Sequence, residues 1–145
     1  MKYYFAYGSN LCKQQMAIRC PESPYLFSGR LEGYKWIIYS RGYANIVPSE
    51  NDYVLGEVFR LSERDEEALD IYESVAEGMY SKEEIDIVTS SGLINCMVYV
   101  DPVQKPGKPK TEYVHRINQG VVSASLCPNY VRKYIRPFVK ETAYY

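Results

Sequence analysis

Two groups of residues in this chain are of types that perform chemistry, and the first is a Gly-Ser-Asn bend at residues 8–10. It follows an aromatic segment, residues 3–7, that is typical of a half-buried strand. The apolar spacing beyond the bend predicts a helix from Asn10, with Ser9 or Asn10 as its N-cap. A strand, a tight turn and a helix start direct several backbone N–H groups at one point, which suits a carboxylate or an oxyanion. An ordinary strand-to-helix corner fits the same residues.

The second candidate is Glu73, near the end of a helix predicted over residues 62–75. At about 100° per residue, Glu73 falls on the flank of the apolar stripe that contains Leu69 and Tyr72. Partial burial and the helix C-terminus both raise the pKa of a carboxyl group, toward the range useful for proton transfer near neutral pH. A solvated glutamate on the helix flank fits the same pattern.

The bend and this acid together resemble the motifs of a known family. Residues 7–11 (YGSNL), directly behind an N-terminal aromatic strand, resemble the signature loop of the γ-glutamylcyclotransferase family, which converts γ-glutamyl-amino compounds into 5-oxoproline and the freed amine. Residues 69–75, followed by residues 78–80 (GMY), look like the family's second motif, whose last acid before a small residue and valine is the catalytic glutamate. That acid maps to Glu73, whereas Ser74 stands where the family usually has glycine.

The resemblance extends in register along nearly the whole chain. Residues 96–99 resemble the strand whose tyrosine lines the family's pocket, and residues 110–113 resemble the start of a helix that carries a second pocket tyrosine. The substrate-binding residues that the resemblance implies are Tyr7, Gly8, Ser9, Asn10, Tyr99 and Tyr113.

The implied reaction is an intramolecular attack of the substrate's α-amine on its own γ-carbonyl, which needs no covalent nucleophile, metal or redox cofactor. Glu73 would take a proton from the α-ammonium group and deliver one to the leaving amine. The backbone N–H groups of the bend would hold the γ-glutamyl unit. These residues address only the γ-glutamyl half of a substrate, so they do not specify the leaving amine.

Other residues offer alternative chemistry. Glu57 lies in an apolar strand face and is an alternative base. Ser9 and His115, the single histidine, form an alternative hydrolase pair, although Ser9 is not in a G-x-S-x-G elbow.

Further alternatives concern the ligand and the class of protein. The loop predicted over residues 101–110 carries lysines that are candidates for contacting a carboxylate of the leaving group: Lys105, Lys108 and Lys110. A non-catalytic module that binds γ-glutamyl or amino-acid ligands in the same pocket is an alternative to the enzyme, as is an interaction protein without a small ligand.

The elements that position these residues follow from the apolar patterns and the turn residues. The predicted strands cover residues 3–7, 25–30, 31–39, 44–47, 53–61, 80–89 and 93–100. The predicted helices start at Asn10, Ser62, Thr111 and Pro128. Pro48 is expected to end a strand, residues 49–52 to form a hairpin tip and Gly120 to stop a helix. This order predicts an α+β fold, with a mainly antiparallel sheet curled or closed into a small β-barrel flanked by helices.

Length and composition limit the classes of function. The 145 residues predict a single domain over 1–145, and a net charge of −1 gives no electrostatic basis for binding nucleic acid or an anionic membrane. We find neither a signal-peptide pattern nor an apolar run of membrane-spanning length. The 4 cysteines form no C-x-x-C pair, so we expect free thiols in a reducing cytoplasm.

Overall fold

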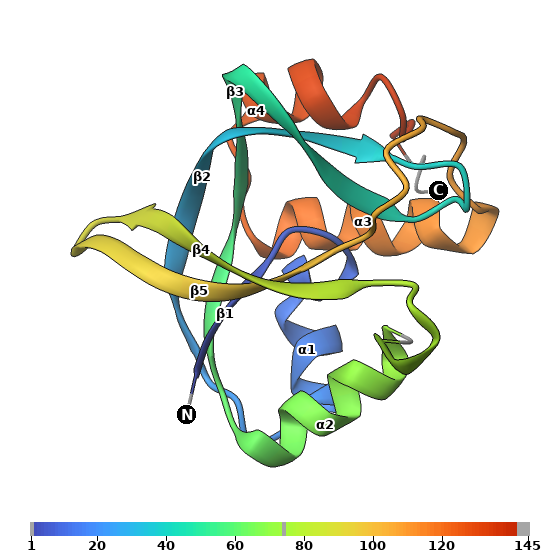
Figure 1. The fold of residues 1–145 in the computed structure, drawn as a ribbon. Coiled ribbons are helices and arrows are strands. Elements are labelled where there is room, and N and C mark those ends of the chain that lie inside the picture. Colours follow the sequence, from blue (N-terminus) through green and yellow to red (C-terminus); the bar gives the residue numbers. More distant parts are fainter. Residues whose placement is uncertain (1, 74, 142–145) are drawn as a thin grey trace.

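The computed structural model describes residues 2–73 and 75–141, and these form a closed barrel of five strands flanked by helices (Figure 1). The strands are β1 (Lys2–Ala6), β2 (Tyr25–Ile38), β3 (Ala44–Leu61), β4 (Ser81–Thr89) and β5 (Gly92–Val100). Their spatial order is β1-β3-β2-β4-β5, and adjacent pairs in this order are antiparallel. β5 then pairs in parallel with β1, where Met97 lies opposite Tyr4, and this pairing closes the barrel. The predicted α+β fold with a small barrel is confirmed.

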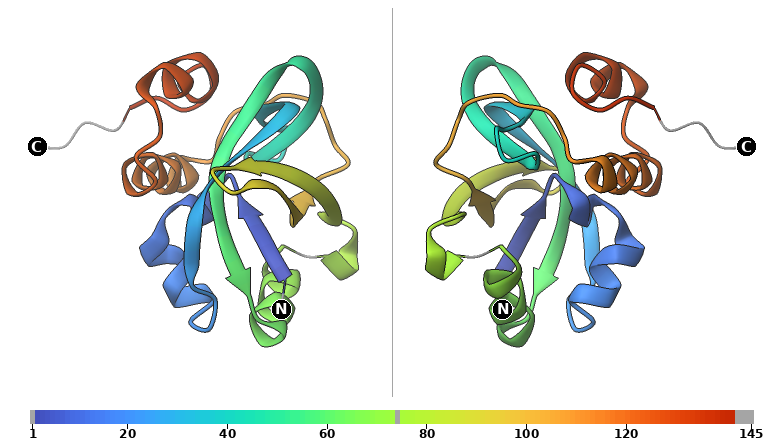
Figure 2. Two further views of the ribbon diagram at one scale, coloured as in Figure 1. Left: turned by 90° about the vertical axis from the view of Figure 1, so that its left-hand side faces the viewer. Right: turned by 90° about the vertical axis from the view of Figure 1, so that its right-hand side faces the viewer.

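The helical elements lie outside the barrel. They are the 3₁₀ turn η1 (Ser9–Leu11), α1 (Lys13–Arg19), α2 (Glu63–Tyr72), the 3₁₀ turn η2 (Val75–Glu77), α3 (Thr111–Ser123), α4 (Pro128–Tyr130) and the π-helical turn η3 (Val131–Ile135). Figures 1 and 2 show α3 and the α4–η3 segment together on one side of the barrel, with α1 and α2 below them. In the described ranges, every helix falls short of the length and apolarity needed to cross a bilayer.

The second half of strand β1, residues 4–6, is buried on both of its faces. Phe5 belongs to the cluster inside the barrel, which continues to Ile117 of α3. Its neighbours Tyr4 and Ala6 belong to a second cluster, which includes Met16 of α1. Alternate residues of a strand point to opposite faces, so β1 is fixed from both sides. The bend that leaves its end therefore starts from a rigid element.

Two breaks predicted within strands were wrong. β2 is continuous where two strands were predicted, and β3 runs through Pro48 and through the predicted tip at residues 49–52. Pro48 is tolerated because it pairs with Tyr34, directly after a register shift at Gly33, which has φ +80. The turn between β2 and β3 lies instead at residues 39–43.

The predicted capping of the first helix was also wrong. Ser9 and Asn10 belong to η1, and α1 starts later, at Lys13, without a side-chain cap. The side chains of both residues are engaged elsewhere, because Arg19 donates hydrogen bonds to them.

Gly120 lies inside α3 and does not stop it. A β-carbon at Gly120 would lie 2.8 Å from Cβ of Leu11. The glycine therefore serves a close approach of α3 to η1, which a larger residue would prevent.

Candidate active site

The bend after β1 is held by its side chains. Arg19 Nη1 donates to Ser9 Oγ at 3.0 Å and to Asn10 Oδ1 at 2.7 Å, and Asn10 Nδ2 donates to the hydroxyl of Tyr4 at 3.1 Å. Ser9 and Asn10 are buried. The first N–H groups of a helical turn have no partner within the turn. The side chains thus fix the bend, while the backbone N–H of Ser9 interacts with the Tyr113 hydroxyl and that of Leu11 bonds to the carbonyl of Gly8 at 3.0 Å.

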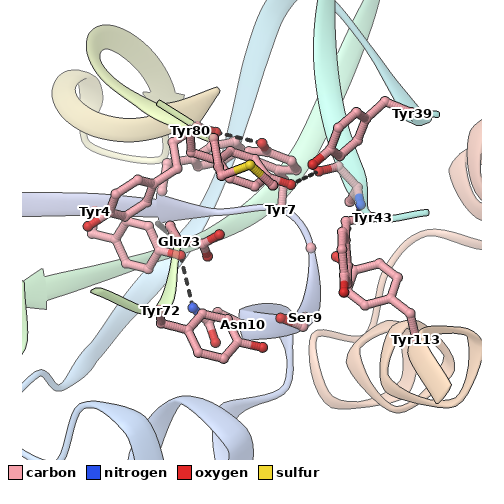
Figure 3. Close-up of a pocket in the computed structure, with 15 residues that line it drawn as sticks. Tyr4, Tyr7, Ser9, Asn10, Tyr39, Tyr43, Tyr72, Glu73, Tyr80 and Tyr113 are labelled. Atoms are coloured by element: carbon pink, nitrogen blue, oxygen red, sulfur yellow. Dashed lines mark hydrogen bonds between the residues drawn. The ribbon is translucent and has the colours of Figure 1, made fainter. Parts of the chain in front are cut away.

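A cavity of about 300 Å³ opens beside the bend (Figure 3). Its wall consists mainly of tyrosine, together with the bend and one carboxyl group. The lining residues are Tyr4, Phe5, Tyr7, Gly8, Ser9, Asn10, Tyr39, Tyr43, Ala44, Tyr72, Glu73, Met79, Tyr80, Tyr99 and Tyr113. A concave site of this volume with a few polar groups suits a small-molecule ligand.

Helix α2 brings Glu73 to this cavity. Ser62, where this helix was predicted to start, caps it, since its Oγ accepts the N–H of Asp65 at 3.1 Å. The helix ends at Tyr72, and the N–H of Glu73 still bonds to the carbonyl of Leu69 at 2.8 Å. Figure 3 shows the carboxyl group of Glu73 among the phenol rings, on the side of the cavity near Tyr4 and the bend.

The residue after Glu73, Ser74, lies outside the described residues. The departure from the family's glycine at this position therefore falls outside the part of the chain that the structure describes.

The environment of Glu73 shifts its proton affinity. Burial raises the pKa of its carboxyl group to about 7, and the positive charge of Arg19 offsets part of that effect. A carboxyl group with this pKa exchanges protons readily near neutral pH, so it can act both as a base and as an acid.

The predicted pocket tyrosines differ in what their hydroxyl groups do. Tyr7 donates to the carbonyl of Tyr99 at 2.6 Å, and Tyr99 donates to Asp70 Oδ1 at 2.7 Å. The Tyr113 hydroxyl accepts the N–H of Ala44 at 3.2 Å, so its own hydrogen is available to a ligand. Tyr99 therefore contributes its ring to the cavity wall, whereas Tyr113 also offers a donor.

Burial, the largest cause in each case, raises the pKa of Tyr7, Tyr99 and Tyr113. These phenols stay protonated at neutral pH, so they form hydrogen bonds but neither release nor take up a proton. Among these cavity groups, the carboxyl of Glu73 is the one whose pKa lies near neutral pH.

The structure brings the predicted site residues to one cavity. The predicted catalytic residue Glu73 lines it, as do all predicted substrate-binding residues: Tyr7, Gly8, Ser9, Asn10, Tyr99 and Tyr113. Their roles in catalysis and binding stay predictions.

Sequence reasoning missed several cavity residues and the arginine beside them. The missed residues are Tyr4, Phe5, Arg19, Tyr39, Tyr43, Ala44, Tyr72, Met79 and Tyr80. Met79 and Tyr80 belong to the GMY segment and Tyr72 precedes Glu73, so position in the motif was an available signal for these three.

The alternative acid and hydrolase pair lie elsewhere. Glu57 is buried on the face of β3 toward α1, with Lys13 Nζ at 3.9 Å, and is not among the cavity residues. His115 is exposed on α3 and does not line the cavity. The Ser9 hydroxyl accepts a hydrogen bond from Arg19 instead.

Of the loop lysines, Lys105 and Lys108 are exposed. Lys110 is also exposed, and its Nζ lies 5.4 Å from the ring centroid of Tyr43, a cavity residue. Within residues 2–73 and 75–141, no three His, Cys, Asp or Glu side chains cluster in a way that could hold a metal ion.

Comparison with known proteins supplies the relatives of this chain. The family model described as gamma-glutamyl cyclotransferase, AIG2-like, matches residues 4–118. The human protein named gamma-glutamylcyclotransferase is 29% identical over 141 residues, covering 90% of this chain and 75% of that protein. The mouse protein of the same name is 30% identical over the same coverage.

Solved structures show the same similarity in three dimensions. A structure of a gamma-glutamyl cyclotransferase is 27% identical and superposes with a TM-score of 0.84, covering 99% of this chain and 90% of that one. YkqA from Bacillus subtilis is 19% identical with a TM-score of 0.81, covering 97% of this chain and 56% of that one, and it shares the fold.

Proposed function

The chain belongs to the gamma-glutamyl cyclotransferase, AIG2-like family, and on that basis we propose that it releases 5-oxoproline from a γ-glutamyl amide with Glu73 as general acid and base. The observation that carries this proposal is the placement of Glu73. Its carboxyl group, with a pKa raised to about 7 by burial, shares one cavity of about 300 Å³ with the Gly8–Asn10 bend.

The bend and the tyrosines hold the substrate in the proposed complex. Backbone N–H groups of the bend bind the carboxylate of the γ-glutamyl unit or the oxyanion that forms on its γ-carbonyl. Tyr113 donates its free hydroxyl hydrogen, and the rings of Tyr7 and Tyr99 form the wall. A substrate held in a curled conformation brings its α-nitrogen to its γ-carbon, and this proximity is worth about 7–11 kcal/mol.

Proton transfer then passes through one carboxyl group. Glu73 removes a proton from the α-ammonium group, and the freed amine attacks the γ-carbon to close a five-membered ring. Glu73 passes this proton to the leaving nitrogen as the tetrahedral intermediate collapses and the bond to that nitrogen breaks. It then takes a second proton from the ring nitrogen, and the departing amine binds that proton to become the ammonium group. The α-ammonium group starts with three hydrogens, of which one stays on the ring nitrogen and two leave with the departing ammonium group.

The cysteines support the proposed cytoplasmic location. Cys12, Cys20, Cys96 and Cys127 are all free, as predicted from their spacing. Free thiols persist in reducing compartments.

A panel of γ-glutamyl compounds tests the activity. Incubation of the protein with γ-glutamyl amino acids, glutathione, γ-glutamyl-lysine and γ-glutamyl amines is expected to release 5-oxoproline from at least one class. Calorimetry on the same panel distinguishes the alternatives. Tight binding without 5-oxoproline would support a binding module, and neither binding nor product would support a protein without a small ligand.

A further inference from the structure

Arg19 joins two parts of the site that are far apart in sequence. Its Nη1 donates to Ser9 Oγ and Asn10 Oδ1 in the bend, at 3.0 and 2.7 Å. Its Nη2 donates to the hydroxyl of Tyr72, and its guanidinium carbon lies 3.8 Å from the centroid of that ring. Tyr72 is the last residue of α2 and directly precedes Glu73.

This set of contacts requires an arginine. A guanidinium group offers donors in a fixed planar fork and stacks on aromatic rings, whereas a lysine ammonium group is a point charge. The single guanidinium group of Arg19 therefore restrains the side chains of Ser9 and Asn10 and also the ring of Tyr72 at the end of α2. Figure 3 shows Asn10, Tyr72 and Glu73 on the same side of the cavity.

Arg19 also supplies the charge that acts on Glu73. The other titratable groups that face Glu73 are phenols from several elements, each with a pKa raised by burial: Tyr4 and Tyr7 of β1 and its end, Tyr80 before β4, Tyr99 of β5 and Tyr113 of α3. These phenols are neutral at pH 7. Within the described part of the chain, the cationic influence on Glu73 comes from Arg19, which stabilises the carboxylate form.

We propose that Arg19 is a positioning residue of this site, which clamps the Ser9–Asn10 bend to the end of α2 and keeps the Glu73 carboxylate available as a base. The inference rests on the proposed function for its catalytic meaning. Arg19 does not line the cavity, so it acts through the bend, Tyr72 and Glu73 and not by contact with the substrate.

A second arginine provides a matched control. Arg116 Nη1 donates to the same Tyr72 hydroxyl at 3.1 Å, and Arg116 pairs with Glu112 within α3. In the ranges that the structure describes, the hydrogen bonds of Arg116 go to Tyr72 and Glu112 and not to the bend, and the charge that acts on Glu73 is that of Arg19. An arginine that merely supports Tyr72 would therefore behave alike at both positions, whereas the proposed clamp would not.

The test compares Arg19→Gln, Arg19→Lys and Arg116→Gln with the wild type. The readouts are the pH profile of kcat/KM for a γ-glutamyl substrate and a carbon-13 NMR titration of the Glu73 carboxyl. In Arg19→Gln, loss of the charge is expected to move the acidic limb and the NMR titration upward by about one pH unit. Loss of the guanidinium hydrogen bonds to the bend and to Tyr72 is expected to lower the plateau value of kcat/KM about 10- to 100-fold.

The other two variants separate charge from geometry. Arg19→Lys keeps the charge, so its acidic limb is expected to stay near that of the wild type while its plateau falls. Arg116→Gln is expected to keep the acidic limb at the same pH as the wild type and the plateau of kcat/KM within about twofold. Should Arg19→Gln fail to fold, Arg19→Lys still tests the fork through its plateau.

The outcomes distinguish this inference from the proposed function. An active wild type whose Glu73 titration and plateau are unchanged in Arg19→Gln would reject the role of Arg19. Equal effects of Arg19→Gln and Arg116→Gln would also reject it. A wild type that releases no 5-oxoproline, with a titration that still moves in Arg19→Gln, would reject the proposed function and support the coupling of Arg19 to Glu73.

Discussion

Replacing Glu73 with glutamine is expected to stabilise the folded protein at high pH and to leave its stability unchanged at low pH. Burial raises the pKa of Glu73 from 4.5 to about 7, so the folded protein binds this proton more tightly than the unfolded chain does. As pH rises between these two values, the unfolded chain loses the proton first. The free energy of unfolding of the wild type therefore falls across this range, and glutamine removes that loss because it does not titrate.

The size of the effect follows from the two pKa values. A tenfold change in proton affinity is worth about 1.4 kcal/mol. The rise from 4.5 to about 7 therefore sets an upper limit of about 3 kcal/mol above neutral pH. Glu73 is only partly buried and lines an open cavity, and solvent screening reduces the expected gain to about 1–2 kcal/mol. A gain of that size raises the Tm of a chain of this length by about 3–8 °C.

Thermal and urea unfolding of three proteins measures this effect. The wild type, Glu73→Gln and the control Glu67→Gln are compared at about pH 4, below both pKa values of Glu73, and at about pH 8, above them. Glu67 is exposed on the same helix, so its replacement makes the same change in charge without relieving burial. A stabilisation by Glu73→Gln that is equal at both pH values, or a loss of stability at the higher one, would refute the reasoning.

Three further predictions test other parts of the site. The acidic limb of the pH profile of kcat/KM is expected near pH 7, because Glu73 must be deprotonated to act as the base, and a limb near pH 4.5 would argue against the raised pKa of this group. Gly8→Ala places a β-carbon 2.9 Å from the Tyr113 hydroxyl, so steady-state kinetics should show kcat/KM reduced about 10- to 100-fold in a folded protein. Gly120→Ala is expected to lower the free energy of unfolding by about 1–3 kcal/mol, because its β-carbon meets Cβ of Leu11 at 2.8 Å. Helix propensity alone predicts a gain of about 1 kcal/mol instead, so urea unfolding decides between the two signs.

Local patterns were sufficient where short-range chemistry determines structure. The Ser62 cap and the body of α2 follow from a capping residue and an apolar stripe, and they place Glu73 at the helix end. The strand before the bend likewise follows from its run of aromatic residues. These elements carry the bend and Glu73, but the local patterns also fit an ordinary corner and a solvated glutamate, so the prediction of a site there came from the family resemblance.

Tertiary partners decided the features that the sequence did not predict. Pro48 usually ends a strand, but a register shift on the partner strand accommodates it within β3. Gly120 resembles a helix stop, yet it serves contact with η1, a partner that no local pattern identifies. Arg19 shows the same limit, because its contact with Tyr72 joins positions 53 residues apart.

The central claim is that Glu73 moves the protons in a cavity that holds a γ-glutamyl group. The most direct test measures 5-oxoproline release by the wild type, Glu73→Gln and Glu67→Gln on the substrate class that the panel identifies, with calorimetry to show that the substrate still binds. We predict that Glu73→Gln binds the substrate and releases no 5-oxoproline, while Glu67→Gln matches the wild type. Wild-type turnover by a folded Glu73→Gln would contradict the account.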